Sequence, residues 1–406
     1  MSQKNELKQL AARATETFQH CDATHSEEDR CGSCEKAVQE HLIALDAAVP
    51  MVKVGSGNIL HLGPGKPVLV DRTTKFAGGG FSTIFASTAT VSPPPRGVSR
   101  LHHHSATPTR GVILKCSDPT DPDVSRPHLI ETVLAQELQA LPPSYQGIAV
   151  GATLAAPIGG MFKLPMAQLE PQYLYATAYP RYDGDLLELL QAGMLDSSRM
   201  FHALAVVAST LATLQDQLKF QHRDLKFENI FFQYSPSSER SVEHKGMAIT
   251  TQDVFFNPII GDFGMSSALI DGVQYGSDFW GSSVDTFLPG GDLCFLAMCL
   301  LSSDGHVLRN EAVRFHRFLW RLAQANPVVQ HGIYAMREGE GDSQQSDSEC
   351  EDDDRVEQTM DSLNIQPRNY DRAMYIITNS PAVDLSMFEP VSVLDALAGQ
   401  DLASSG

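Results

Sequence analysis

Hydrophobic and polar positions divide the first third of the chain into two kinds of predicted structure. The segment EKAVQEHLIALDAAV (35–49) carries apolar residues at helical spacing, so residues 1–50 are expected to be helical. Residues 51–116 follow the pattern of strands and turns. They are interrupted at 91–110 by a stretch rich in Pro, Ser and His, which is expected to form a surface loop between two strands.

Further along the chain the pattern shifts towards helices. Residues 127–141 predict an amphipathic helix, and residues 142–183 return to short strands. From 185 to 325 helical patterning dominates, apart from a polar stretch at 234–253. Because strands come first and helices follow, the predicted fold class is α+β with two lobes.

Composition narrows the classes of function. The chain has 406 residues, of which 42% are hydrophobic and 19% charged, which is typical of a globular protein. Asp and Glu number 49 against 30 Lys and Arg, a net charge of −19, which argues against nucleic acid as a direct partner. An acidic surface suits a basic peptide substrate, although such a surface also serves solubility alone.

The chain carries no sign of export or membrane insertion. Its polar N-terminus has no signal-peptide apolar stretch, and the longest apolar run, Leu293–Leu301, is too short to cross a bilayer. Seven cysteines without disulfide-framework spacing indicate reduced thiols. We therefore expect an intracellular protein, cytoplasmic or nuclear, without a membrane partner.

The strongest chemical motif is QHRDLKFEN (221–229). It presents a carboxylate at Asp224, which can accept a hydrogen bond from an incoming hydroxyl and orient it. Lys226 can reach a phosphate as charge develops on it, and Asn229 offers an amide oxygen to a metal ion. Phosphoryl transfer needs these elements: a positioned hydroxyl, neutralised phosphates and bound metal.

A second motif, IIGDFG (259–264), follows in the chain. An apolar strand delivers Asp262, whose carboxylate can chelate Mg²⁺, a hard cation that prefers oxygen ligands. Gly264 permits the backbone turn that follows. Both motifs together, in this order, are far more specific than either alone.

These two motifs resemble those of the eukaryotic protein kinase family, over roughly residues 70–395. The catalytic loop matches the family's H-R-D-L-K-x-x-N. The resemblance implies a bilobal fold, with a β-rich N-lobe and a mainly helical C-lobe, and the cofactors ATP and Mg²⁺. It also implies that Asp224 is the catalytic base, that Lys226 marks a serine/threonine kinase, and that Asn229 and Asp262 hold magnesium.

Upstream, FAGGGFSTIF (76–85) resembles the family's glycine-rich loop, in which backbone N–H groups approach phosphates. The match is imperfect, because Ala77 and Ser82 stand where the outer glycines usually lie. A plain hairpin turn is the alternative interpretation. The residues expected to bind the nucleotide here are Gly78, Gly79, Gly80, Phe81, Ser82 and Ile84.

The strand GVILKC (111–116) places Lys115 towards the α- and β-phosphates, by the same resemblance. Its partner should be a glutamate on the next helix. LIETVLAQELQAL (129–141) offers Glu131 and Glu137, of which Glu131 is preferred. The other glutamate is expected to face solvent.

Other segments match the family in part. YPRYDGDLLELL (179–190) resembles the hinge of the family. Its residue pattern is similar to that of kinases of herpesviruses and other large DNA viruses. A viral kinase would act in the host cell. Asp292 is either the aspartate that braces the catalytic loop or a simple helix N-cap. The family's Ala-Pro-Glu is absent between Asp262 and Asp292, which leaves peptide docking and activation in doubt.

Phosphorylation of the segment after Asp262 is a further possibility that the sequence raises. A phosphate there would pair with Arg223, which precedes the catalytic Asp224. The candidates are Ser266, Ser267, Tyr275 and Ser277.

Two other clusters have simpler explanations. Four residues near the N-terminus offer zinc ligands, but their spacing is not diagnostic and reduced thiols on a helical extension are favoured. Residues 337–357 hold 10 acidic residues against 2 arginines, a local net charge of −8 that is typical of a solvated, low-complexity segment. The candidate zinc ligands are Cys21, Cys31, Cys34 and His41, with His25 nearby.

The sequence thus predicts a serine/threonine protein kinase that acts on protein substrates, with basic motifs as one option. The alternative is a pseudokinase that binds ATP as a scaffold. A small-molecule kinase of the same fold is disfavoured by Lys226. The predicted domains are a helical extension at 1–50, an N-lobe at 51–183 with the loop 91–110, and a C-lobe at 184–406 with insertions at 234–253 and 337–357.

Overall fold

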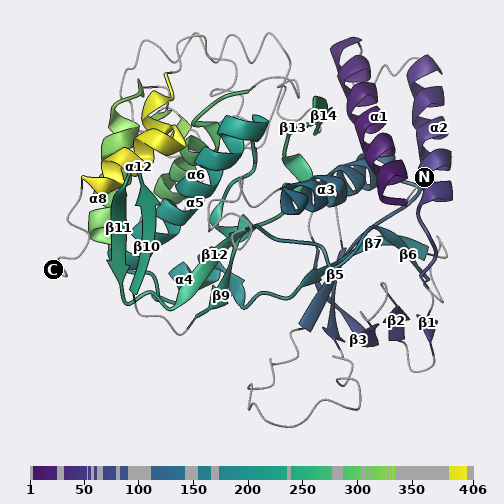
Figure 1. Cartoon of the computed structure of the whole chain (residues 1–406), viewed down its shortest axis with the longest axis horizontal. Coiled ribbons are helices and arrows are strands. Elements are labelled where there is room, and N and C mark those ends of the chain that lie inside the picture. Colours follow the sequence, from purple (N-terminus) through teal and green to yellow (C-terminus); the bar gives the residue numbers. More distant parts are fainter. Residues whose placement is uncertain are drawn as a thin grey trace, which may run out of the picture. The chain divides into compact units, whose positions relative to one another are not determined.

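The fold was analysed in a computed structural model of the chain (Figure 1). The structure describes residues 3–24, 32–52, 54–55, 59–61, 67–78, 83–89, 111–141, 154–165, 173–235, 239–276, 287–302, 308–333 (except 309, 311, 328 and 331) and 384–399. The loop 91–110 and the acidic stretch 337–357 lie outside these residues.

The chain divides into two units, each assembled from separate stretches of sequence. Unit 1 comprises residues 1–146, 154–183 and 261–277. Unit 2 comprises residues 147–153, 184–260 and 278–406. The segment that begins just before Asp262 therefore belongs with unit 1, although it directly follows the 184–260 stretch of unit 2 in the sequence.

Unit 1 contains a seven-stranded antiparallel sheet in the order β1-β2-β3-β4-β5-β7-β6. On β5, Val112, Leu114 and Cys116 alternate towards a buried core that they share with Phe162 and Leu164, so Lys115 points to the opposite face. The strands are β1 (Val54–Gly55), β2 (Ile59–His61), β3 (Pro67–Gly78), β4 (Thr83–Ala89), β5 (Gly111–Ser117), β6 (Phe162–Pro165) and β7 (Tyr173–Pro180).

Three helices and a short hairpin complete unit 1 (Figure 1). α1 (Gln3–Thr24) and α2 (Gly32–Ala48) lie in the region for which the sequence predicts helix. α3 contacts β5, α1 and the 3₁₀ helix η4 (Phe263–Met265). The strands β13 (Ala268–Ile270) and β14 (Val273–Tyr275) form the hairpin.

α3 spans Pro122–Ala140, so it begins five residues before the predicted start at 127. The Asp121 side chain accepts a hydrogen bond from the Asp123 N–H and caps the helix, and Pro122 occupies the first turn. Pro127 lies inside the helix. A proline within a helical pattern normally marks a boundary, which is why the sequence pattern placed the start too late.

Unit 2 is built around the helix α5 (Ser197–Leu218), which contacts α8 and α12. The sequence predicts mainly helix between 185 and 325, but several strands also form in this range. The helices are α4 (Leu186–Gln191), η3 (Phe227–Asn229), α6 (Gly291–Ser302), α8 (Val313–Gln324), η5 (Ser386–Phe388) and α12 (Pro390–Ala398); the strands are β8 (Gly184–Asp185), β9 (Ile230–Tyr234), β10 (Glu239–His244), β11 (Met247–Gln252) and β12 (Phe256–Ile260).

The polar stretch 234–253 forms the hairpin β10–β11, and one side of this hairpin is packed rather than exposed. Ile249 and Thr251 are buried, and Thr251 hydrogen-bonds His202 of α5 at 3.1 Å. At the tip, Lys245 Nζ donates to Asp395 of α12 at 2.8 Å. The tip itself is exposed at Lys245, Gly246 and Met247, whereas the alternation that buries Ile249 and Thr251 is hidden among polar residues.

The protein is therefore a mixed α+β protein, as the order of the elements in the sequence predicts. Among the described residues, no helix is both long and apolar enough to cross a membrane.

Candidate functional site

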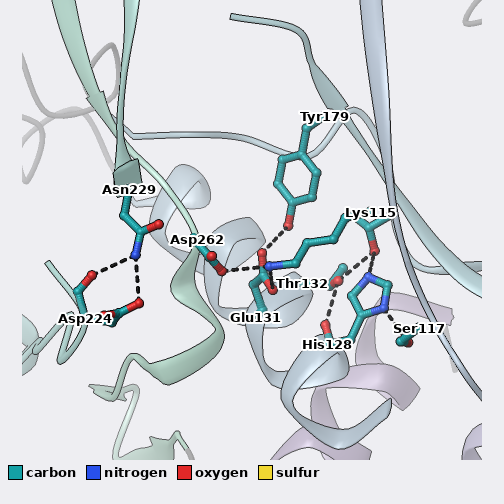
Figure 2. A network of polar contacts seen from close by, with 10 residues as sticks. Lys115, Ser117, His128, Glu131, Thr132, Tyr179, Asp224, Asn229 and Asp262 are labelled. Carbon is teal, nitrogen blue, oxygen red and sulfur yellow. Dashed lines mark hydrogen bonds and ion pairs between the residues drawn. The ribbon is translucent and has the colours of Figure 1, made fainter. Parts of the chain in front are cut away.

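A group of charges in unit 1 surrounds Lys115. Its ammonium lies 2.7 Å from Glu131 Oε2 on α3 and 2.7 Å from Asp262 Oδ1 (Figure 2). The two carboxylates differ in exposure: the Glu131 side chain is 4% exposed and that of Asp262 is 43% exposed. Glu131 therefore holds the Lys115 ammonium on its buried side, while the Asp262 carboxylate stays accessible to a ligand.

Local backbone structure explains how these three side chains meet. The alternation of β5 sends Lys115 to the face that α3 covers. Asp262 has a left-handed backbone, with φ 59° and ψ 69°, a conformation that non-glycine residues rarely adopt. Such strained positions are concentrated at functional sites. A Cβ added to Gly264 would lie 3.6 Å from Glu131 Oε2, so this segment runs close to α3.

The electrostatics of the cluster keep Lys115 charged. Burial alone would lower the Lys115 pKa, but the negative charges of Asp262 and Glu131 outweigh burial and raise the pKa above its ordinary value. Burial raises the pKa of Glu131, and Lys115 offsets only part of this effect. The result is a fixed ammonium group, which suits the binding of an anion.

A buried polar network that the sequence did not indicate supports this cluster. His128 of α3 hydrogen-bonds Ser117 Oγ at 2.7 Å and Thr177 Oγ1 at 2.9 Å (Figure 2). Thr132 of α3 also hydrogen-bonds Thr177 on β7, at 2.8 Å. The network ties the helix that carries Glu131 to β5 and β7. A single histidine in an apolar stretch gave no signal of this role.

Glu137, the other candidate partner of Lys115, has a different role. It lies 2.8 Å from Lys8 and 3.2 Å from Lys4, both on α1. Its side chain is only 11% exposed, so the expectation that the remaining glutamate faces solvent is wrong. The two glutamates lie six residues apart on α3, and each meets its own lysine partners.

In unit 2, the QHRDLKFEN segment folds into a tight polar loop. Lys226 Nζ lies 3.0 Å from Asp224 Oδ2. The Asn229 amide nitrogen donates to the Asp224 carbonyl at 2.7 Å and to Asp224 Oδ2 at 2.9 Å (Figure 2). Since both of these hydrogen bonds use the nitrogen, the Asn229 amide oxygen remains as a ligand atom.

Asp292 of α6 anchors the backbone of this loop. Its carboxylate accepts hydrogen bonds from the His222 N–H at 3.0 Å and the Arg223 N–H at 2.8 Å, all buried. Asp292 lies inside α6, so the bracing alternative describes it and the N-cap alternative does not. The helix start is crowded: Gly290 has φ +84°, and a Cβ there would lie 2.6 Å from the Leu385 carbonyl oxygen.

The remaining nucleotide-binding predictions are covered only in part. Gly78 ends β3 opposite Thr83 of β4, and Ile84 of β4 is half-buried opposite Lys115 of β5. The loop between these strands lies outside the described residues, and it contains Gly79, Gly80, Phe81 and Ser82.

The candidate phosphorylation sites do not suit a phosphate in this conformation. Ser266, Ser267 and Tyr275 are 0%, 2% and 1% exposed, so their hydroxyls are closed to an external kinase. Ser277 lies outside the described residues. Phosphorylation of Ser266, Ser267 or Tyr275 would therefore require this segment to rearrange.

The possible zinc cluster is only partly described. Cys21 lies in α1, and Cys34 and His41 in α2, while His25 and Cys31 lie outside the described residues. His41 is 7% exposed. Within the described part of the chain, no group of three or more His, Cys, Asp or Glu side chains could hold a metal ion.

A search for relatives finds no match, either to a protein-family model or to a curated protein.

The residues present fit magnesium bound together with phosphate. Asp262 offers a half-exposed carboxylate and Asn229 an amide oxygen, both hard ligands of the type that Mg²⁺ prefers. Mg²⁺ takes most of its remaining ligands from phosphate oxygens and water, so a dense protein cage is unnecessary. Asn229 and Asp262 belong to different units.

Proposed function

We propose that the protein is a serine/threonine protein kinase, which transfers the γ-phosphate of Mg-ATP to a protein hydroxyl. In this proposal the two units are the N-lobe and C-lobe of a bilobal kinase fold. The observation that carries the proposal is the Lys115 cluster: a buried ammonium held by two carboxylates that are distant from it in sequence. A lysine positioned in this way is suited to the α- and β-phosphates of a nucleotide.

Asp224 supplies the base for the acceptor. Its carboxylate accepts a hydrogen bond from the incoming Ser or Thr hydroxyl and orients the oxygen towards the γ-phosphorus. The new O–P bond forms as the bond between the γ-phosphorus and the β-γ bridging oxygen breaks, and ADP leaves. The hydroxyl proton passes to Asp224 and then to solvent.

Lys226 and Lys115 neutralise negative charge on the phosphate groups during the reaction. Lys226 lies 3.0 Å from Asp224, where it can neutralise the phosphoryl group as this group approaches the acceptor. Bound Mg²⁺, held by Asn229 and Asp262, would neutralise the phosphate oxygens. Asp292 keeps the loop backbone fixed through three hydrogen bonds, which supports a preorganised site.

The test is transfer of labelled phosphate from ATP by the purified full chain, with Mg²⁺, to a basic generic protein substrate. Asp224→Asn keeps the size and hydrogen-bonding capacity of the side chain but removes the charge, so transfer should fall by about 10²-fold or more. Asp216→Asn, an exposed change on α5, is the matched control and should leave transfer unchanged.

Loss of transfer with Asp224→Asn, together with label on Ser or Thr, would support the proposal. If wild type and Asp224→Asn give equally little label while ATP still raises the melting temperature of both, the pseudokinase alternative replaces it. An acceptor other than protein, with no labelled Ser or Thr, would point instead to a small-molecule kinase.

A further inference from the structure

α1 packs into unit 1 along one continuous face. Its apolar residues Leu7, Leu10, Ala11 and Ala14 are 2%, 6%, 0% and 0% exposed, at the spacing of one helical face. α1 contacts α2, α3 and β14 (Figure 1). The helix therefore touches both the element that carries Glu131 and the segment that follows Asp262.

Thr15 makes a specific contact with the end of that segment. Its hydroxyl donates to the Ala11 carbonyl at 3.0 Å and accepts from the Gly276 backbone N–H at 3.2 Å. The site is buried, with Thr15 at 1% exposure. Gly276 has φ +150°, and a Cβ there would lie 2.7 Å from the Ser267 side chain. Thr15 thus supplies the acceptor for a backbone group in a tightly constrained turn.

Lys8 makes a second set of contacts, about two turns of α1 away from Thr15. Its ammonium lies 2.8 Å from Glu137 of α3 and 3.7 Å from Asp271, in the turn between β13 and β14. Burial lowers the Lys8 pKa, but the Glu137 charge and hydrogen bond outweigh burial and raise it. The stronger contact is the one to Glu137, because the Asp271 side chain is 82% exposed.

The segment after Asp262 is consequently held at both ends. Near its start, η4 packs on α3. At its end, Gly276 is hydrogen-bonded to α1. Between these points, Ser266, Ser267 and Tyr275 are buried, so their hydroxyls are occupied by packing rather than open to a phosphate.

We propose that α1 is a positioning element for the reaction, which holds α3 and the 261–276 segment so that Glu131 and Asp262 meet Lys115. Lys8 and Thr15 are its positioning residues. In this chain α1 performs, through permanent contacts, the ordering of the segment that a phosphate would otherwise provide. The inference rests on the proposed kinase function for its catalytic part, but the ordering of the segment can be measured without any activity.

Two pairs of variants of the full chain separate positioning from simple packing. Thr15→Val keeps the shape of the side chain and removes the acceptor for Gly276, while Thr15→Ser retains the hydroxyl. Lys8→Met keeps the aliphatic stem and removes the charge, while Lys8→Arg retains the charge. Lys36→Met is the matched control, since within the described part of the chain Lys36 pairs only with Glu40, on the exposed surface of α2, at 3.7 Å.

Two measurements are made on each variant: amide hydrogen exchange of residues 261–276, and kcat and KM for ATP in phosphate transfer. For Thr15→Val we expect exchange at Gly276 and β14 to accelerate about five- to tenfold, since one buried hydrogen bond is lost. We also expect kcat to fall about three- to tenfold with a smaller change in KM, because misplaced groups weaken the transition state more than binding. Thr15→Ser and Lys8→Arg should recover most of both properties.

The outcomes separate the two proposals. Faster exchange and lower kcat in Thr15→Val and Lys8→Met, with recovery in Thr15→Ser and Lys8→Arg, support the inference. If exchange in Thr15→Val equals that of Lys36→Met, or if exchange rises while kcat stays at the wild-type value, the inference is overturned alone. If the wild type transfers no phosphate, the kinase proposal fails and the catalytic part of this inference fails with it, whatever the exchange data show.

Discussion

The lysine–carboxylate clusters around Lys115 and Lys226 are built in opposite ways. In unit 1, Lys115 is held by two carboxylates from α3 and from the segment after β12, and the Glu131 side chain is 4% exposed. In unit 2, Lys226 meets Asp224 two residues away in the chain, and their side chains are 26% and 16% exposed. The first cluster depends on the fold to bring distant residues together, whereas the second depends on a short loop.

The two clusters are held in place by different interactions. Removing one partner from a buried ion pair leaves an uncompensated charge, so the first cluster is energetically sensitive. The Lys226–Asp224 pair is more accessible than the Lys115–Glu131 pair, and its geometry comes from backbone hydrogen bonds to Asp292 instead. We therefore expect substitutions in the two clusters to affect stability very differently, even where both abolish activity.

The largest expected difference is between Lys115→Met and Lys226→Met. Lys115→Met leaves Glu131 buried without its cation and should lower the free energy of unfolding by about 3 kcal/mol. Lys226→Met removes a partly exposed pair, in which Asp224 keeps its hydrogen bond from Asn229, and should cost about 1 kcal/mol. Urea unfolding of both variants against wild type measures the contrast. Equal losses would contradict the distinction between the two clusters.

A smaller effect is expected at the brace of the second cluster. Asp292→Ala leaves the buried N–H groups of His222 and Arg223 without their acceptor, which should cost about 2–3 kcal/mol and reduce phosphate transfer. Asp196→Ala, at the N-cap of α5, is the matched control and should cost about 1 kcal/mol while transfer is retained. A loss at Asp292 no larger than that at Asp196 would mean that Asp292 acts only as a helix-terminal residue.

The smallest expected effect concerns the pH dependence of the polar network beside Lys115. Burial, and then the charge of Lys115, lower the pKa of His128 to about 3. An unfolded histidine takes up a proton below about pH 6.5, so between 6.5 and 3 the unfolded state binds more protons than the fold. The free energy of unfolding should therefore decrease as the pH is lowered through this window, by up to about 1.4 kcal/mol per pH unit from His128.

His128→Gln tests this contribution. The variant should show a shallower fall in unfolding free energy between about pH 6 and 5 than wild type does. Part of the slope will remain, because burial and the charges of Arg126 and Arg13 also lower the pKa of His41, to about 4. Identical slopes for variant and wild type would exclude His128 as a titrating group in unfolding.

The sequence alone located the second cluster better than the first, for a physical reason. Asp224, Lys226 and Asn229 fall within nine residues, so local spacing defines their chemistry. The pairing of Lys115 had two candidates, and only the packing of α3 separates Glu131 from Glu137. The α+β class followed from the order of the elements.

Other features depend on tertiary contacts that have no local pattern. His128 joins the network through Thr177, which lies 49 residues away, and Thr15 meets Gly276 across 261 residues. The burial of Ser266 and Ser267 likewise results from packing, and the sequence around them does not indicate it. The packed side of the hairpin β10–β11 likewise has no clear signal in the sequence, because its buried residues alternate with polar ones.

The most direct test of the central claim, that one cluster holds the nucleotide and the other transfers phosphate, measures ATP binding and phosphate transfer on the same preparations. Isothermal titration with Mg-ATP and the labelled transfer assay would be run on wild type, Lys115→Met and Asp224→Asn. We predict that both variants lose transfer, that Lys115→Met also loses most of its affinity for Mg-ATP, and that Asp224→Asn binds Mg-ATP as wild type does. Transfer that persists in Asp224→Asn, or wild-type affinity in Lys115→Met, would contradict the account.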